Sequence, residues 1–132
     1  MTEGALAGKR VFVVGGETVL GRAVLIGLGE AGADIAIASL TADTKAEFAI
    51  NSALNELWAL GCTGIALPIE ATDAEQVRRA VERAERELGM LDLVVAAGEV
   101  ASEALDGRES IELTGDADPS EALASVVTRL SG

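Results

Sequence analysis

The stretch VFVVGGETVLGRAV, residues 11–24, decides the fold, because it predicts a buried strand, a glycine-rich turn and the start of a helix. Its run of Val and Phe is typical of a parallel sheet that is covered on both faces. Gly15, Gly16 and Gly21 fit a tight turn whose backbone N–H groups, with the helix N-terminus, face a phosphate. The alternative is an ordinary strand-to-helix connection, in which Gly21 only allows close packing.

Outward from this stretch, short apolar runs alternate with longer amphipathic segments. Strands are expected at residues 10–16, 34–39, 64–69 and 91–98, with a short fifth at 110–115. Helices are expected at residues 18–33, 44–61, 72–89 and 118–131, with a helical turn at 101–107. This order predicts one domain, residues 1–132, with an α/β fold: a three-layer, doubly wound parallel sheet (Rossmann-like) of four to five strands. Such a sheet binds ligands beyond the carboxyl ends of its strands.

The composition narrows the function. The formal net charge of −12 argues against nucleic acid or an anionic membrane as partner, since both are polyanions. Without His or Tyr, the chain alone cannot carry Ser-His-Asp chemistry, a His-ligated metal or tyrosine acid–base catalysis. We therefore expect no catalytic and no metal-binding residues. Cys62 is the only cysteine, which excludes an internal disulfide and fits a cytoplasmic protein.

Three further features concern aromatic side chains, a helix start and the acidic residues near the end of the sequence. Phe48 and Trp58 suggest a stacking platform, but core or interface positions on an amphipathic helix explain them better. Thr72 and Glu75 fit a capping box at the start of the third helix. Residues 99–132 hold eight acidic residues against two arginines, and a solvated surface explains them better than a cation site.

Two segments together resemble the short-chain dehydrogenase/reductase family. VGGETVLG (14–21) resembles the family's T-G-x-x-x-G-x-G turn. IEATDAEQVRRAVERAERELGMLDLVVAAG (69–98) resembles its D-V-T-D turn, third helix and N-N-A-G strand end. The resemblance covers about residues 6–98 and implies a dinucleotide-binding Rossmann domain, with residues 99–132 as a divergent acidic segment.

The departures from the family pattern fall at functional positions. Valine replaces the threonine and the middle glycine, glutamate the aspartate, and valine and alanine the two asparagines, at Val14, Val19, Glu70, Val95 and Ala96. The match ends after Gly98. The family's catalytic Ser and Tyr-x-x-x-Lys lie further along, in a part that this chain does not have. The resemblance therefore implies a truncated domain that is not active alone.

The resemblance places candidate dinucleotide contacts at four strand ends. They are Gly15, Gly16, Glu17, Val19, Leu20 and Gly21 after the first strand, Ser39, Leu40, Thr41 and Lys45 after the second, Glu70 after the third, and Ala96, Ala97 and Gly98 after the fourth. Val19 puts a branched Cβ where backbone should approach the ligand, and valine tolerates a positive φ poorly. Glu17 repels a phosphate unless it points to solvent or pairs with Arg22.

Ser39 bears on which dinucleotide fits. An acidic residue at the end of the second strand selects the ribose 2′-hydroxyl of NAD. Ser39, Thr41 and Lys45 can instead receive a 2′-phosphate, which slightly favours NADP over NAD; the alternative is polar residues in an ordinary turn. Glu70 either approaches the adenine edge or is simply a polar residue that ends a strand.

Three functions are compatible with these residues. The first is a dinucleotide-binding domain of the short-chain dehydrogenase type that is catalytically incomplete alone. The second is a structural or regulatory module that has lost nucleotide binding. The third is part of an NADP-dependent oxidoreductase that another chain or segment completes. A homodimer is also expected, because the fourth strand, LVVAA (93–97), lies at a sheet edge unless residues 110–114 cover it.

Overall fold

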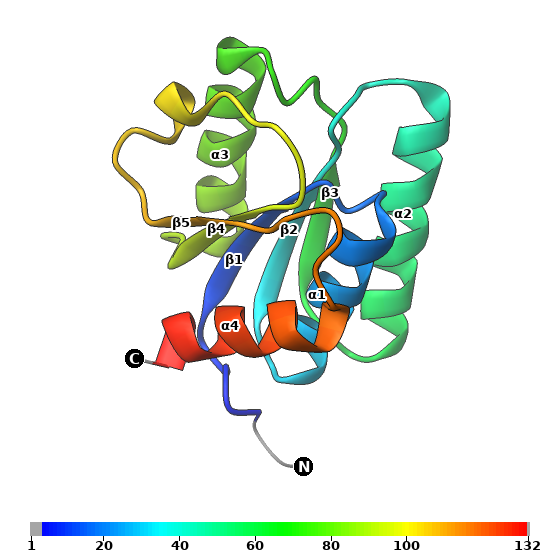
Figure 1. Ribbon diagram of the computed structural model, residues 1–132, viewed down its shortest axis with the longest axis vertical. Coiled ribbons are helices and arrows are strands. Elements are labelled where there is room, and N and C mark those ends of the chain that lie inside the picture. Colours follow the sequence, from blue (N-terminus) through cyan, green and yellow to red (C-terminus); the bar gives the residue numbers. More distant parts are fainter. Residues whose placement is uncertain (1–3, 132) are drawn as a thin grey trace.

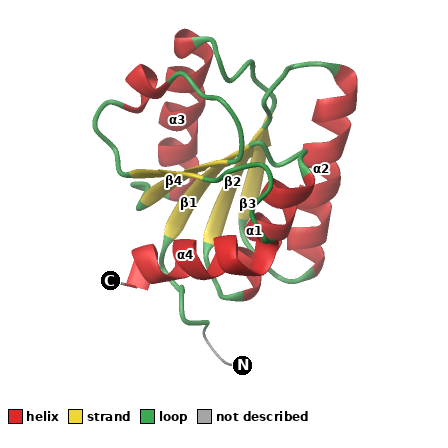
Figure 2. Ribbon diagram, viewed as in Figure 1, coloured by secondary structure: helices red, strands yellow, loops and turns green. Residues whose placement is uncertain are grey.

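A parallel sheet with helices on both faces forms the centre of the molecule (Figures 1 and 2). The computed structural model describes residues 4–131, so residues 1–3 and Gly132 of the expected domain lie outside it. The strands are β1 (Arg10–Val14), β2 (Asp34–Ala38), β3 (Gly64–Leu67), β4 (Leu93–Ala96) and β5 (Ser110–Glu112). They run parallel in the order β3-β2-β1-β4-β5. The predicted doubly wound α/β fold is confirmed.

The helical elements occur where the sequence predicted them, but most end a few residues earlier. They are α1 (Val19–Glu30), α2 (Thr44–Ala59), α3 (Ala74–Leu88), the 3₁₀ turn η1 (Ser102–Leu105) and α4 (Pro119–Ser131). The capping box predicted at Thr72 is wrong. Asp73 caps α3 instead, because its carboxylate accepts hydrogen bonds from the amides of Glu75 and Gln76.

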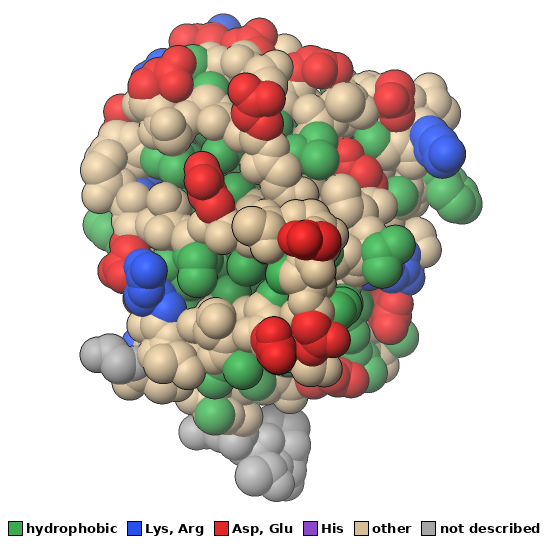
Figure 3. All heavy atoms as spheres, viewed as in Figure 1, with side chains coloured by type: hydrophobic (Ala, Val, Ile, Leu, Met, Phe, Trp, Pro, Cys, Tyr) green, Lys and Arg blue, Asp and Glu red, His purple; other side chains and the backbone are tan. Residues whose placement is uncertain are grey.

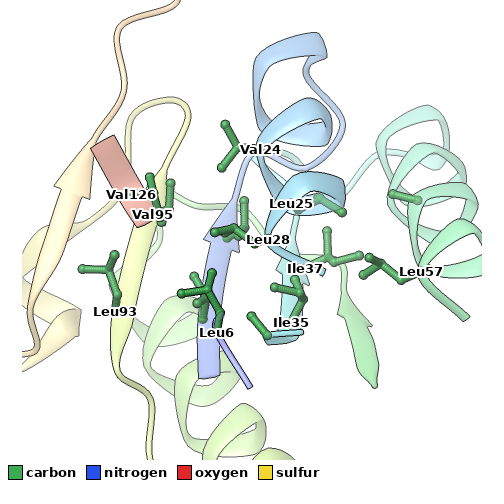
Figure 4. Close-up of a cluster of buried hydrophobic side chains, with 14 of the residues drawn as sticks. Leu6, Val24, Leu25, Leu28, Ile35, Ile37, Leu57, Leu93, Val95 and Val126 are labelled. Atoms are coloured by element: carbon green, nitrogen blue, oxygen red, sulfur yellow. The ribbon is translucent and has the colours of Figure 1, made fainter. Parts of the chain in front are cut away.

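The larger apolar core lies between the sheet and the helices α1, α2 and α4 (Figure 4). Alternate residues of β1, Val11 and Val13, face this layer because side chains along a strand alternate between its two faces. Around them the core gathers buried aliphatic side chains from both the strands and the helices, among them Leu25, Leu28, Ile35, Ile37, Leu57, Val95 and Val126. The sheet and α1 therefore hold each other in place at the start of the glycine-rich turn.

The opposite face of the sheet packs against α3 and η1. Phe12 and Val14 of β1 are fully buried there. Arg108, between η1 and β5, ties this layer together. Its Nε and Nη2 donate to the two carboxylate oxygens of Glu85 in α3, at 3.1 and 2.7 Å.

The fourth strand is not a sheet edge. Residues of β5 pair with it in parallel register, Val94 with Ser110 and Ala96 with Glu112. After β5 the chain returns along the other layer, where α4 packs against α1 (Figure 1). The exposed apolar edge on which the predicted homodimer depended is therefore covered.

The surface carries both charge and a few large apolar side chains. Acidic side chains are spread over the face drawn in Figure 3, in keeping with the net charge of −12. Phe48 and Trp58 are 76% and 55% exposed, so neither belongs to the core of this chain. Within residues 4–131, no helix has both the length and the apolar character to cross a membrane.

Candidate functional site

The candidate site lies at the edge of the sheet where the strands end. Val14 is in register with Ala38 of β2 and Ala96 of β4, so the segments after these residues leave the sheet side by side. These segments are the glycine loop (residues 15–18), the β2–α2 loop (residues 39–43) and residues 97–98. A doubly wound sheet binds its ligands at this edge.

The glycine loop is a tight turn held by its own hydrogen bonds. Gly15 has a φ of 93°, which favours glycine, and the amides of Gly15 and Gly16 donate to the Ala38 carbonyl at 2.8 and 3.2 Å. The Thr18 Oγ1 donates to the Gly15 carbonyl at 2.8 Å and accepts from the Gly21 amide at 2.9 Å. These three glycine amides are thus used by the protein itself.

Three other amides remain for an anion at the start of α1. Within the described part of the chain, the N–H groups of Glu17, Val19 and Leu20 have no acceptor. A helix N-terminus with unpaired N–H groups attracts negative charge, because the helix dipole adds to the hydrogen bonds. A phosphate site at this turn therefore rests on these three amides and not on those of the glycines.

Close packing alone accounts for Gly21. A Cβ at this position would lie 2.1 Å from the Gly15 carbonyl oxygen, so the turn could not close around any larger residue. Val19 is the first residue of α1 and does not have a positive φ, so the predicted backbone strain is wrong. Its side chain is 86% exposed at the helix start, whereas that of Leu20 is buried in the core.

Glu17 takes neither of the two orientations that the sequence suggested. It does not pair with Arg22, whose Nη2 instead donates to Glu56 at 2.7 Å. It does not point freely into solvent either. Its Oε2 accepts a hydrogen bond from the Leu40 amide at 2.8 Å, and its Oε1 is shielded from solvent without a partner. The glycine loop and the β2–α2 loop are joined through this carboxylate.

Ser39 cannot contact a ligand, which corrects its predicted role. Its side chain is fully buried, donating to the Ile69 carbonyl at 3.3 Å and accepting from the Ile69 amide at 3.0 Å. Thr41 donates to Asp43 at 3.0 Å. Lys45 remains exposed and, with Glu17, Thr41, Asp43 and two alanines, lines a cavity of about 180 Å³, which we call the Lys45 pocket. Of the three residues proposed for a 2′-phosphate, two are left.

Asp43 keeps a negative charge in the Lys45 pocket. A hydrogen bond from the Ala46 amide, helped by one from Thr41, lowers the pKa of Asp43. This carboxylate is the N-cap of α2 and therefore stays ionised. The pocket thus holds two carboxylates, those of Glu17 and Asp43, beside one ammonium group.

At the same edge of the sheet, Glu70 and Leu40 make contacts within the protein. The Glu70 Oε2 accepts from the Ala42 amide at 2.7 Å, so this side chain joins the segment after β3 to the β2–α2 loop. The Leu40 side chain covers Gly98, where an added Cβ would come within 2.7 Å of it. Ala96 is a buried strand end, and the Ala97 amide donates to the Val14 carbonyl at 2.8 Å.

Sequence reasoning missed the bond between Glu17 and Leu40 and the bond between Glu70 and Ala42. Both join segments far apart in the chain, and an acidic residue in a turn carries no signal about which distant amide it will bind. Within residues 4–131, no group of three or more His, Cys, Asp or Glu side chains is placed to hold a metal ion.

This arrangement of strands, glycine loop and helix defines a nucleotide-binding type of α/β fold, and comparison with known proteins gives the family. The family model for short chain dehydrogenase matches residues 9–115. The chain belongs to the short-chain dehydrogenase family. The match continues past Gly98, where the resemblance in the sequence ended, and includes β5.

Individual relatives agree with the family model. The chain is 33% identical over 91 residues to 5-keto-D-gluconate 5-reductase of Escherichia coli strain K12, and 35% identical over 91 residues to L-rhamnose 1-dehydrogenase (NAD(P)(+)) of Sphingomonas. Each alignment covers 69% of this chain and 34% of the relative. A solved short-chain dehydrogenase/reductase from Serratia marcescens superposes with a TM-score of 0.66 at 27% identity, over 73% of this chain and 38% of that one. The chain spans about a third of the length of these relatives.

Proposed function

We propose that this chain binds a nicotinamide dinucleotide at the carboxyl edge of its sheet and forms the cofactor-binding part of a short-chain oxidoreductase. The observation that carries the proposal is the set of three unpaired amides, those of Glu17, Val19 and Leu20, at the start of α1. They lie beside a tight glycine turn in a member of a dehydrogenase family. A dinucleotide pyrophosphate is the anion that this combination suits best.

The family relationship supports the same ligand. One of the relatives, L-rhamnose 1-dehydrogenase, carries NAD(P)(+) in its name. The chemistry of hydride transfer belongs to the cofactor, so the task of these residues is to bind and orient it.

In our proposal this chain is not active alone. It has no tyrosine, so a Tyr-x-x-x-Lys group of the kind that the family resemblance implies has to come from another segment or another chain. Hydride transfer is then expected only when that part is added. The same segment or chain is expected to determine the substrate.

A second candidate, a structural or regulatory module without nucleotide, is favoured by one observation. The Leu40 side chain covers Gly98, and the Glu17 carboxylate holds Leu40 there, so a nucleotide has to rest on this cover or displace it. Binding measurements separate the two candidates.

The test is calorimetric titration with NAD⁺ and NADP⁺ of the wild type, Val19→Gly and Ala23→Gly. We expect the wild type to bind one dinucleotide. Val19→Gly should bind it a few-fold more tightly, because an exposed branched side chain leaves the anion site. Ala23→Gly is the control, since it places the same flexible residue at an exposed position of α1 away from the loop. If neither the wild type nor Val19→Gly binds, the result contradicts dinucleotide binding by this chain and supports the second candidate.

We also propose a homodimer in the cytoplasm. The single free thiol, Cys62, supports a reducing compartment. The exposed apolar side chains of α2, Phe48 and Trp58, support a dimer, whereas the edge of β4 does not, because β5 covers it. A monomeric mass by light scattering at high concentration would contradict it.

A further inference from the structure

Glu17 contributes its backbone amide to the proposed pyrophosphate site, and its side-chain carboxylate has a separate role. It begins in the glycine loop and ends beside β2, because its Oε2 accepts from the Leu40 amide at 2.8 Å. An acidic group near the end of the second strand is what a ribose 2′-hydroxyl requires. Here Ser39 holds that strand position and is buried against Ile69. The end of β2 has no carboxylate of its own, and Glu17 places one there from the glycine loop.

Only half of this carboxylate is satisfied. Glu17 Oε1 and Arg10 Nε are the two buried side-chain atoms without a hydrogen-bond partner that residues 4–131 contain. Arg10 starts β1 and lies beside Gly89, at the opposite end of the sheet. An unpaired buried acceptor costs free energy, and that cost is recovered if the Glu17 side chain turns in the pocket that it lines so that a ligand hydroxyl donates to Oε1. Arg22 does not serve this purpose, because it is paired with Glu56.

The charges around Glu17 point the same way. The Lys45 pocket, which Glu17 lines, contains Asp43 as a second carboxylate and Lys45 as its one cation. A 2′-phosphate placed there would meet two negative charges for one positive, whereas a neutral hydroxyl meets no such repulsion.

We propose that Glu17 is the specificity-determining residue for the dinucleotide: its carboxylate accepts the 2′-hydroxyl of the adenosine ribose and excludes a 2′-phosphate, so that the chain takes NAD. This inference rests on the proposed function, and it reverses the slight preference for NADP that Ser39 suggested. The ligand class is a dinucleotide with an unmodified ribose.

The experiment is calorimetric titration of the wild type, Glu17→Gln, Glu17→Asp and Glu30→Gln with NAD⁺ and NADP⁺ at one salt concentration. The wild type should bind NAD⁺ at least about tenfold more tightly than NADP⁺. Glu17→Gln keeps an acceptor for Leu40 but loses the charge, and should weaken NAD⁺ about tenfold while bringing the two affinities together. Glu17→Asp keeps the charge but draws the carboxylate back, and should weaken NAD⁺ without admitting NADP⁺.

Glu30→Gln is the matched control, because it removes the same charge from an exposed residue at the other end of α1. It should leave both affinities within about twofold of the wild type. Melting temperatures of all four proteins show whether each is folded; if Glu17→Gln does not fold, Glu17→Asp carries the test.

The outcomes separate the two proposals. A wild type that binds NADP⁺ more tightly, or a Glu17→Gln variant with an unchanged ratio, overturns the role of Glu17 and leaves dinucleotide binding intact. If only Glu17→Gln binds a dinucleotide and the other three proteins do not, that role is also overturned, and the Glu17 carboxylate blocks the site. If none of the proteins binds either dinucleotide, both proposals are wrong.

Discussion

The glycine loop and the segment after β4 satisfy their polar groups differently. At the start of α1, three amides and one oxygen of Glu17 have no partner within residues 4–131. In the later segment, Arg108 is held by Glu85 and by the Leu105 carbonyl, and Arg129 by Glu109 at 2.8 Å. A buried unpaired oxygen costs stability, so the glycine loop bears a cost at Glu17 Oε1 that a ligand donor can relieve, whereas these two arginines of the later segment are already paired. The paired arginines of the later segment stabilise the fold.

The largest expected effect lies in the glycine loop. Gly21→Ala places a Cβ 2.1 Å from the Gly15 carbonyl oxygen, so the backbone of the turn has to shift, and the free energy of unfolding should fall by about 3 kcal/mol. Gly115→Ala, in the later segment, meets nothing within 4 Å and should change it by less than about 0.5 kcal/mol. Urea denaturation measures both. Equal effects would show that the loop is not tightly packed.

The next effect concerns the ion pair of the later segment. Arg108→Met removes two hydrogen bonds from a half-buried Glu85 and should cost about 2 kcal/mol of unfolding free energy. Arg79→Met removes an exposed pair with Glu75 in the same helix and should cost less than about 0.5 kcal/mol. A smaller loss in Arg108→Met than in Arg79→Met would contradict the structural role of this segment.

The same ion pair predicts a dependence on pH. Hydrogen bonds from Arg108, opposed by burial, lower the pKa of Glu85 below its ordinary value of 4.5. A carboxylate whose pKa falls on folding adds stability above the unfolded pKa and loses it as the pH drops through the folded pKa. The difference in unfolding free energy between wild type and Arg108→Met should therefore be full at pH 7 and shrink below pH 4.5. A constant difference down to pH 3 would contradict this.

The smallest effect is expected at Cys62, at the amino end of β3 and away from both regions. Its burial, together with Glu30 and Asp34, raises the pKa of its thiol. Reaction with a thiol reagent at pH 8 should be several-fold slower than for a free cysteine derivative, because the thiolate is the reactive form. A saturating dinucleotide should leave this rate unchanged. A large change would place the ligand at the wrong end of the sheet.

The sequence predicted the fold well because local patterns fix it. Runs such as that of β1 specify a buried parallel strand, and the strands and helices follow in the predicted order. The site was predicted less well, since its key contacts are not local. The bond from Glu17 to Leu40 spans 23 residues, and Ser39 turned inward to Ile69 because the strand ends offered it two backbone partners. Phe48 and Trp58 fitted a helical stripe but face outward.

The most direct test of the account is a ¹⁵N–¹H correlation spectrum recorded during titration with NAD⁺. We expect the shifted amides to be those of residues 17–20 and Leu40, where the unpaired donors and the Glu17 carboxylate lie. Amides of β5 and α4 should stay in place. A spectrum without shifts, or with shifts gathered in residues 99–131, would contradict the claim that the glycine loop of this chain is a dinucleotide site.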